Sequence, residues 1–76
     1  MNDADKELDA RGLNCPLPIL KTKKSLADMA SGQVLKVTST DCGSVKDMQA
    51  FSNQTGNELL SSKEANGEYI FMIKKK

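Results

Sequence analysis

Apolar and polar positions along the chain recur with two different periods, and these periods predict six elements. Alternation of apolar and polar residues predicts strands over residues 6–10, 33–40, 57–64 and 68–74, of which 33–40 is rich in β-branched residues. Stretches with apolar residues at helical spacing predict helices over about 16–29 and 44–54. The expected order of elements is therefore βαβαββ.

Turn signals separate these stretches. Gly32 and Gly56 are the expected stops of the two helices, and Asn66-Gly67 is typical of a type I′ hairpin. Ser44 and Asp47 have the spacing of a capping box, which predicts that the second helix begins at Ser44. The apolar positions expected on one face of each element are Leu8, Ala10, Ile19, Leu20, Leu26, Ala27, Ala30, Leu35, Val37, Val45, Met48, Phe51, Tyr69, Phe71 and Ile73.

The fold expected from this order is a two-layer α/β sandwich. The 76 residues make one domain, residues 1–76, in which residues 1–5 are expected to be frayed. A strand–helix–strand unit implies parallel pairing with a right-handed crossover. The sheet should therefore be four-stranded and mixed, with both helices on one face because so short a chain lacks helices to cover two. The other face would be open to water or to a partner.

The candidate chemistry lies in the stretch Gly12-Leu13-Asn14-Cys15-Pro16-Leu17-Pro18. Proline is tolerated in the first turn of a helix, so Pro16 and Pro18 place Cys15 at or just before a helix N-terminus. Free N–H groups and the helix dipole there favour the thiolate, which is the reactive form of cysteine. The alternative is that Cys15 is only a small buried apolar residue.

Composition narrows the chemistry that Cys15 can perform. The chain has no histidine, so the usual base partner of a nucleophilic cysteine is absent, and two cysteines cannot complete a zinc site, so no metal is expected. Position 18 is proline, which excludes a C-x-x-C redox pair. Attack on sulfur by a thiolate needs no base once the thiol is ionised. Sulfur transfer is therefore the reaction that these residues favour.

Charge and hydropathy exclude other classes of protein. A net charge of +1 is too balanced for a general nucleic-acid binder, so no direct nucleic-acid binding is expected. No apolar run approaches the ~20 residues of a membrane span, and the acidic N-terminus does not look like a signal peptide. Two cysteines without a secretory signal indicate a reducing compartment. We therefore expect a cytoplasmic protein without membrane association.

Four cations lie close to the motif in the sequence. Arg11 precedes it, and Lys21, Lys23 and Lys24 follow it within three helical turns. They would lower the pKa of Cys15 and steer an acidic partner toward it, so the lysines form a candidate docking patch. The alternative is that these lysines only form a solvated helix face without a role in binding. The basic tail at 74–76 is likewise expected to be solvated.

Cys42 is a candidate second thiol. The fold places both thiols at the edge where strands end and helices begin, which is the usual edge for sites in open α/β sheets. We expect Cys15 and Cys42 to be neighbours without a disulfide bond. The alternative is that Cys42 is a turn residue whose thiol has no role.

The run from Leu8 to Pro18 resembles the signature of the TusA/SirA-like sulfur-carrier (sulfurtransferase) proteins. The resemblance extends over residues 40–41, 43–47, 50–51 and 56–59, and so covers nearly the whole chain. It implies a βαβαββ sandwich in which Cys15 carries sulfur as a persulfide, supported by Arg11, Gly12, Pro16 and Pro18. Two positions depart from the pattern: Cys42 stands where many members have proline, and Ser52 where some have a second cysteine.

The resemblance also implies partners. The donor would be a cysteine desulfurase or a rhodanese, and the acceptor a cysteine of another protein, of the DsrE/TusD type. No cofactor is expected, and the free protein should be a monomer. The sulfur would serve tRNA thiolation, molybdenum-cofactor assembly or sulfur oxidation. The competing interpretation is a non-catalytic binding or regulatory module that uses the open sheet face, with Cys15 structural.

Overall fold

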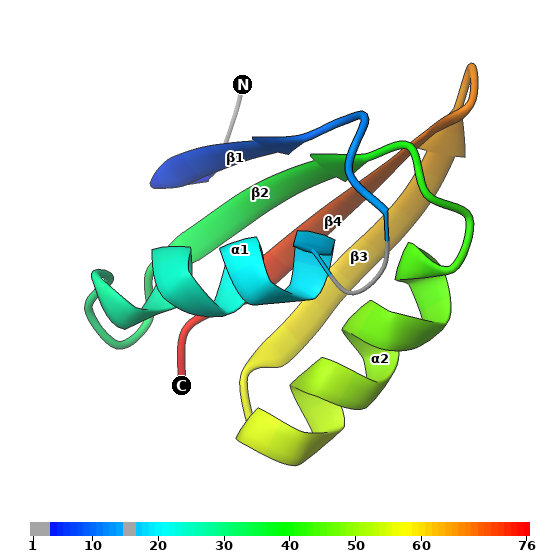
Figure 1. The fold of residues 1–76 in the computed structure, drawn as a ribbon. Helices are drawn as coiled ribbons and strands as arrows, with labels where there is room; N and C mark the ends of the chain where they lie inside the picture. Colours follow the sequence, from blue (N-terminus) through cyan, green and yellow to red (C-terminus); the bar gives the residue numbers. More distant parts are fainter. Residues whose placement is uncertain (1–3, 15–16) are drawn as a thin grey trace.

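The computed structural model describes residues 4–14 and 17–76, and it contains the six expected elements in the expected order (Figure 1). They are β1 (Lys6–Ala10), α1 (Leu17–Ala27), β2 (Val34–Ser39), α2 (Ser44–Thr55), β3 (Glu58–Ala65) and β4 (Glu68–Lys74). The bounds of β1 and β4 equal the predicted ones, and α1 is shorter than predicted. α2 ends one residue later than predicted, and β2 and β3 differ from the prediction by one residue at each end.

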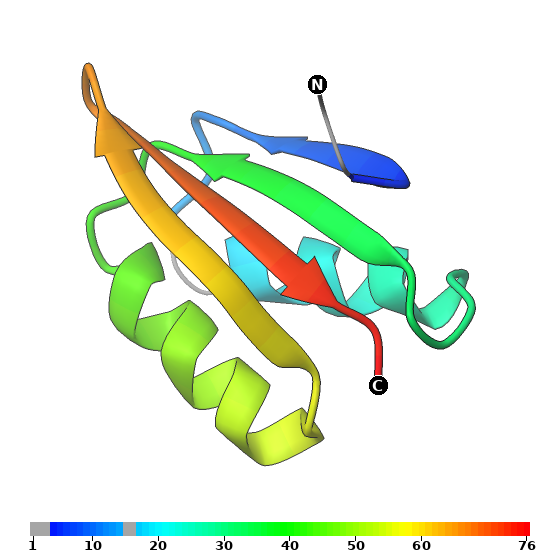
Figure 2. The ribbon, with the colours of Figure 1, turned by 180° about the vertical axis from the view of Figure 1, so that it is seen from behind.

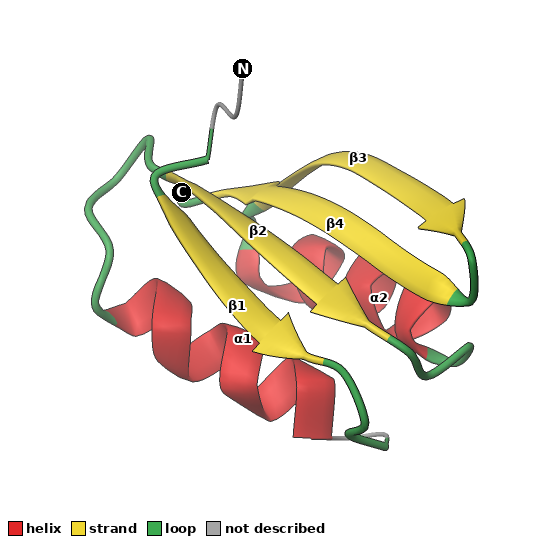
Figure 3. Ribbon diagram, turned by 90° about the horizontal axis from the view of Figure 1, so that it is seen from above, coloured by secondary structure: helices red, strands yellow, loops and turns green. Residues whose placement is uncertain are grey.

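The four strands form one mixed sheet in the order β1-β2-β4-β3. β1 pairs with β2 in parallel, whereas β4 runs antiparallel to both of its neighbours. Figure 3 shows α1 and α2 packed on the same face of this sheet, and Figure 2 shows the opposite face, which neither helix covers. The two-layer α/β sandwich predicted from the sequence is confirmed. Neither described helix is long and apolar enough to cross a membrane.

The core lies between the sheet and the two helices. Leu35 and Val37 of β2 are fully buried, as are Phe71 and Ile73 of β4, so the predicted alternation of these central strands is confirmed. Met48 from α2 is also fully buried. Burying each of these side chains contributes roughly 1.5–3 kcal/mol to stability, which makes the two central strands the anchor of the domain.

The buried face of α1 differs from the predicted one. The structure buries Pro18, Thr22 and Leu26, which follow one another at a spacing of four residues. Thr22 tolerates burial because its hydroxyl donates a hydrogen bond of 2.7 Å to the carbonyl of Pro18. Burial of Leu26 is confirmed, and Ile19 is half-buried against the core. The prediction is wrong for three positions that are exposed, Leu20, Ala27 and Ala30.

Asp5 and the last residues of the chain are more tightly held than expected. Asp5, within the segment expected to be frayed, donates its N–H to Val34 O and accepts Val34 N–H, each at 2.8 Å. At the C-terminus, Lys75 N donates to Gln33 O at 2.7 Å, and Lys76 N donates to an Asn57 side-chain oxygen at 2.8 Å. The prediction of a solvated tail at 74–76 is therefore wrong for the backbone.

The turn signals are correct for the hairpin and for the end of α2, whereas Gly32, the predicted stop of the first helix, has φ 88° but lies five residues beyond the end of α1 at Ala27. Asn66 and Gly67 both have positive φ, 54° and 79°, as a type I′ hairpin requires. Gly56 has φ 80° and ends α2, with its N–H donated to Ser52 O at 2.9 Å. The hairpin and the stop of α2 are thus confirmed.

Candidate functional site

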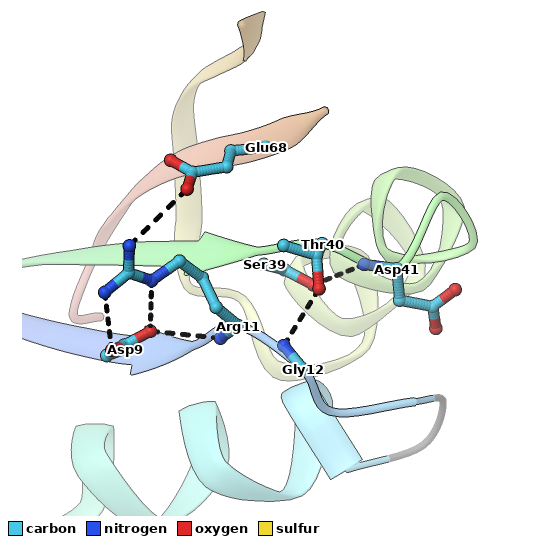
Figure 4. Close-up of polar contacts among 7 residues, drawn as sticks. All are labelled: Asp9, Arg11, Gly12, Ser39, Thr40, Asp41 and Glu68. Carbon is cyan, nitrogen blue, oxygen red and sulfur yellow. Dashed lines mark hydrogen bonds and ion pairs between the residues drawn. The ribbon is translucent and has the colours of Figure 1, made fainter. Parts of the chain in front are cut away.

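Two loops meet at one edge of the sheet (Figure 1). The first loop, residues 11–16, joins β1 to α1, and the second loop, residues 40–43, joins β2 to α2. Because β1 and β2 are parallel, both loops leave the same edge. The two loops are joined directly: Gly12 N donates a hydrogen bond of 2.9 Å to the hydroxyl of Thr40 (Figure 4). This edge is the one predicted from the order of elements.

Cys15 and Pro16 lie outside the described residues, so the predictions that concern them remain predictions. The described residues on either side are bonded to each other, since Leu17 N donates to Asn14 O at 2.8 Å. Leu13 N donates to Ala10 O at 3.3 Å, and the Leu13 side chain packs against the core. The chain is therefore held both before and after Cys15.

The start of α1 depends on Pro18. This residue lies in the first turn of the helix, as predicted, and its side chain is fully buried. Its carbonyl accepts the Thr22 hydroxyl, which adds a side-chain bond to the first turn. Pro18 thus fixes the end of α1 that follows Cys15, with Leu17 as the first helical residue.

The second loop is fixed by buried hydroxyl groups. Ser39 and Ser44 are both buried, and their hydroxyl oxygens lie 2.7 Å apart. Asp41 N donates to Ser39 Oγ at 3.2 Å, and Gly43 N donates to Asp41 Oδ1 at 3.1 Å. The predicted capping box at Ser44 is wrong: Gly43 is the N-cap, it makes no side-chain cap, and the Ser44 hydroxyl faces Ser39 instead.

Arg11 is paired with two carboxylates (Figure 4). Its Nε and Nη2 lie 2.9 and 3.0 Å from Asp9, and its Nη1 lies 3.5 Å from Glu68 of β4. Hydrogen bonds from the Arg11 side chain, and then from its backbone N–H, lower the pKa of Asp9 to about 2. Arg11 was predicted to act as a cation on Cys15, but its charge is largely matched by these carboxylates.

The three lysines of α1 do not form one patch. All are exposed, and Lys21 and Lys24 lie one turn apart on the outer face of the helix. The same outer face carries Leu17 and Leu20, which are 43% and 54% exposed. Lys23 instead lines the groove between the helices that also includes Lys75 and Lys76. The predicted docking patch is thus reduced to Lys21 and Lys24, together with two exposed leucines.

Cys42 is an exposed free thiol in the second loop. Burial raises the pKa of the Tyr69 hydroxyl in β4, and the charges of Glu64, Cys42 and Asp41 raise it further. The expectation that Cys42 neighbours Cys15 involves a residue outside those described, so it stays a prediction.

Sequence reasoning missed the residues that hold this edge together. The Thr40 hydroxyl joins the two loops, and the hydroxyls of Ser39 and Ser44 bond each other across the second loop. Glu68 pairs with Arg11. The resemblance included Thr40 and Ser44, but nothing in the sequence gave their partners. Glu68 is 57 positions from Arg11, and only the sheet brings them together.

Comparison with known proteins identifies the family of this chain. The family model described as sulfurtransferase TusA matches residues 6–75. The chain belongs to the TusA family. The sulfur carrier protein TusA of Allochromatium vinosum is 65% identical over 75 residues, which are 99% of this chain and 99% of that one.

Other members agree with this assignment. A putative sulfur carrier protein of Neisseria meningitidis is 48% identical over 91% of this chain and 93% of its own. The crystal structure of a SirA-like protein from Desulfitobacterium hafniense superposes with a TM-score of 0.81 at 27% identity. That match covers 91% of this chain and 95% of the other, so nearly the whole TusA-family fold is shared.

Gly12 generates a prediction about the first loop. Its φ of +80° is unfavourable for side chains, although a Cβ there would meet nothing within 4 Å. We expect Gly12→Ala to lower the free energy of unfolding by about 1–2 kcal/mol, and Gly12→Asn to cost less because Asn tolerates this conformation. Urea denaturation measures both. Equal stability of Gly12→Ala and the wild type would show that the loop adopts a negative φ in solution.

The pairing of Arg11 with Asp9 predicts how the stability of the protein depends on pH. The pKa of Asp9 is lower in the folded state than in an unfolded chain, so the pairing stabilises the protein above about pH 4 and is lost as pH falls through about 2. We expect Arg11→Gln to return the Asp9 pKa toward about 3.9, measured by NMR titration. An unchanged pKa in the variant would mean that another group holds the carboxylate. The pair does not titrate between pH 5 and 9, so its own charges stay constant over that range.

Proposed function

We propose that this protein accepts sulfane sulfur as a persulfide on Cys15 and passes it to a cysteine of a partner protein. The observation that carries the proposal is the 65% identity, over 99% of both chains, to the Allochromatium vinosum sulfur carrier. Cys15 stands two positions before the first residue of α1, where a helix N-terminus favours the thiolate. The chain has no histidine to serve as a base, and this chemistry needs none.

The transfer is an exchange at sulfur. The Cys15 thiolate attacks the outer sulfur of the donor's persulfide, a new S–S bond forms, and the donor's own S–S bond breaks to release its thiolate. A thiolate of the acceptor then attacks the outer sulfur on Cys15, which leaves Cys15 as a thiolate again. Both steps conserve electrons, so no oxidant, reductant or cofactor is needed.

Partners would be protein donors and acceptors that bind in turn. A cysteine desulfurase or a rhodanese is the expected donor, and a DsrE/TusD-type protein is the expected acceptor. Thiol chemistry of this kind suits the reducing cytoplasm, and a monomer leaves Cys15 accessible to both partners. The sulfur would then serve tRNA thiolation, molybdenum-cofactor assembly or sulfur oxidation.

The outer face of α1 is the surface that we assign to docking. Lys21 and Lys24 flank Leu17 and Leu20 there, and α1 contains no acidic residue. Exposed apolar side chains beside cations fit a partner surface that has an apolar centre and an acidic rim. Brief contact through so small a surface suits a carrier that must leave each partner.

Mass spectrometry of the intact protein tests the carrier role. After incubation with a cysteine desulfurase and cysteine, or with a rhodanese and thiosulfate, we expect the wild type to gain one sulfur atom. The gain should vanish in Cys15→Ser and persist in Cys42→Ser. A gain lost in both variants would assign Cys42 a part in loading. No gain with any donor, on a folded protein with a free thiol, would reject the carrier role in favour of a binding module.

Charge reversal tests the docking face. We expect Lys21→Glu combined with Lys24→Glu to slow sulfur uptake from a donor with an acidic surface by up to about tenfold at low salt, with less effect at high salt. The matched control is Lys46→Glu combined with Lys63→Glu, which changes the net charge equally at exposed positions on α2 and β3. If the control pair slows uptake as much, net charge rather than the α1 face controls the rate.

A further inference from the structure

We infer that Thr40 is a positioning residue for the chemistry of Cys15, because its hydroxyl in the second loop fixes the backbone of the first loop. This inference rests on the proposed function and adds to it a residue outside the C-P-x-P motif. The contact that carries it is the 2.9 Å hydrogen bond from Gly12 N to Thr40 Oγ1, which joins positions 28 residues apart in the sequence (Figure 4).

Thr40 projects from a rigid segment. It follows Ser39, whose buried hydroxyl bonds Ser44 at 2.7 Å and accepts Asp41 N at 3.2 Å. The backbone of Asp41 is held again, since Ser44 N donates to Asp41 O at 3.0 Å. The residues on both sides of Thr40 are therefore fixed to the start of α2, and a buried hydroxyl pair is costly to separate. Thr40 is thus a fixed point to which the first loop is attached.

The first loop needs such a fixed point. Gly12 has φ +80°, and its N–H is the group that Thr40 holds. One residue earlier, Arg11 is held on the uncovered sheet face by Asp9 and Glu68. Arg11 is thus bonded to the sheet and Gly12 to the second loop. Only Leu13 and Asn14 separate Gly12 from Cys15 in the sequence. The Thr40 bond is the contact that sets the loop relative to the second helix.

Loss of this bond should act on reactivity more than on folding. The Gly12–Thr40 pair is exposed, so water can satisfy both groups when the bond is broken, and the global stability changes little. The first loop would then sample more conformations, so the reactive arrangement of Cys15 would be populated for less of the time. A neutral hydrogen bond contributes on the order of 1 kcal/mol, which corresponds to about a fivefold change in the reactive population.

The test compares Thr40→Val, which keeps the shape but removes the hydroxyl, with Thr40→Ser, which keeps the hydroxyl. Thr38→Val is the matched control, since it makes the same change two residues earlier in β2, on the half-buried uncovered face. All variants carry Cys42→Ser, so that iodoacetamide reports on Cys15 alone. The readouts are the alkylation rate from pH 5 to 9, the apparent thiol pKa that it gives, sulfur loading by a donor, and the urea midpoint.

We expect Thr40→Val to slow alkylation at neutral pH about fivefold, to raise the apparent thiol pKa, and to slow sulfur loading similarly, at a nearly unchanged urea midpoint. Thr40→Ser and Thr38→Val should behave as the parent. The inference is overturned if Thr40→Val alkylates at the parental rate, if Thr40→Ser is equally slow, or if the thiol pKa stays unchanged while the urea midpoint falls. Alkylation needs no sulfur donor, so failure of the parent protein to load sulfur would reject the proposed function without deciding the role of Thr40.

Discussion

The parallel pairing of β1 with β2 is the constraint on which the functional edge depends. Its register places Ala10, the last residue of β1, opposite Ser39, the last residue of β2. The residues that follow, Arg11-Gly12 and Thr40-Asp41, therefore leave the sheet side by side, and the Gly12–Thr40 bond forms between them. A slip of one residue would turn Leu8 and Ala10 from the core to the uncovered face. Burial of Ala10 thus fixes the register, and the register brings the loops together.

The charges at this edge follow from the same sheet. Asp9 and Arg11 lie two positions apart, so their side chains leave the same side of β1, away from the helices. Glu68 begins β4, which pairs with β2 and so brings its carboxylate within reach of Arg11 (Figure 4). The arginine of the motif consequently holds the loop in place, while the net positive charge near Cys15 in the sequence comes from α1. The sequence alone shows four cations near Cys15, but the sheet pairs Arg11 with Asp9 and Glu68 and leaves the lysines of α1 exposed.

The sequence was a good guide where one local pattern sufficed. The alternation of Leu35 and Val37 predicted the buried face of β2, and Asn66-Gly67 predicted the hairpin, because both depend on short-range rules of pleat and turn. Prediction of the buried face of α1 was only partly right because burial there includes Thr22, which a hydropathy pattern counts as polar. Its hydroxyl is satisfied by the Pro18 carbonyl one turn earlier, so the helix turns Thr22 inward and leaves Leu20 exposed. The Ser39–Ser44 pair was unpredictable for a similar reason, since two buried hydroxyls are stable only in the geometry that joins them.

A protein that hands sulfur between partners has a different structural requirement from an enzyme with a closed site. In the proposed function two proteins reach the Cys15 thiol in turn, so it should not be enclosed in a cavity, and without histidine its reactivity would depend on its location. The fold meets this requirement by holding the approach to Cys15 at Gly12 and the departure from it at Pro18, while the second loop and the core supply the fixed points. The docking face proposed on α1 is compatible with this arrangement, since Leu17 and Leu20 are exposed on its outer side. The exposed leucines and the buried threonine of α1 thus have one cause: the helix turns its polar Thr22 inward and leaves Leu17 and Leu20 on its outer face.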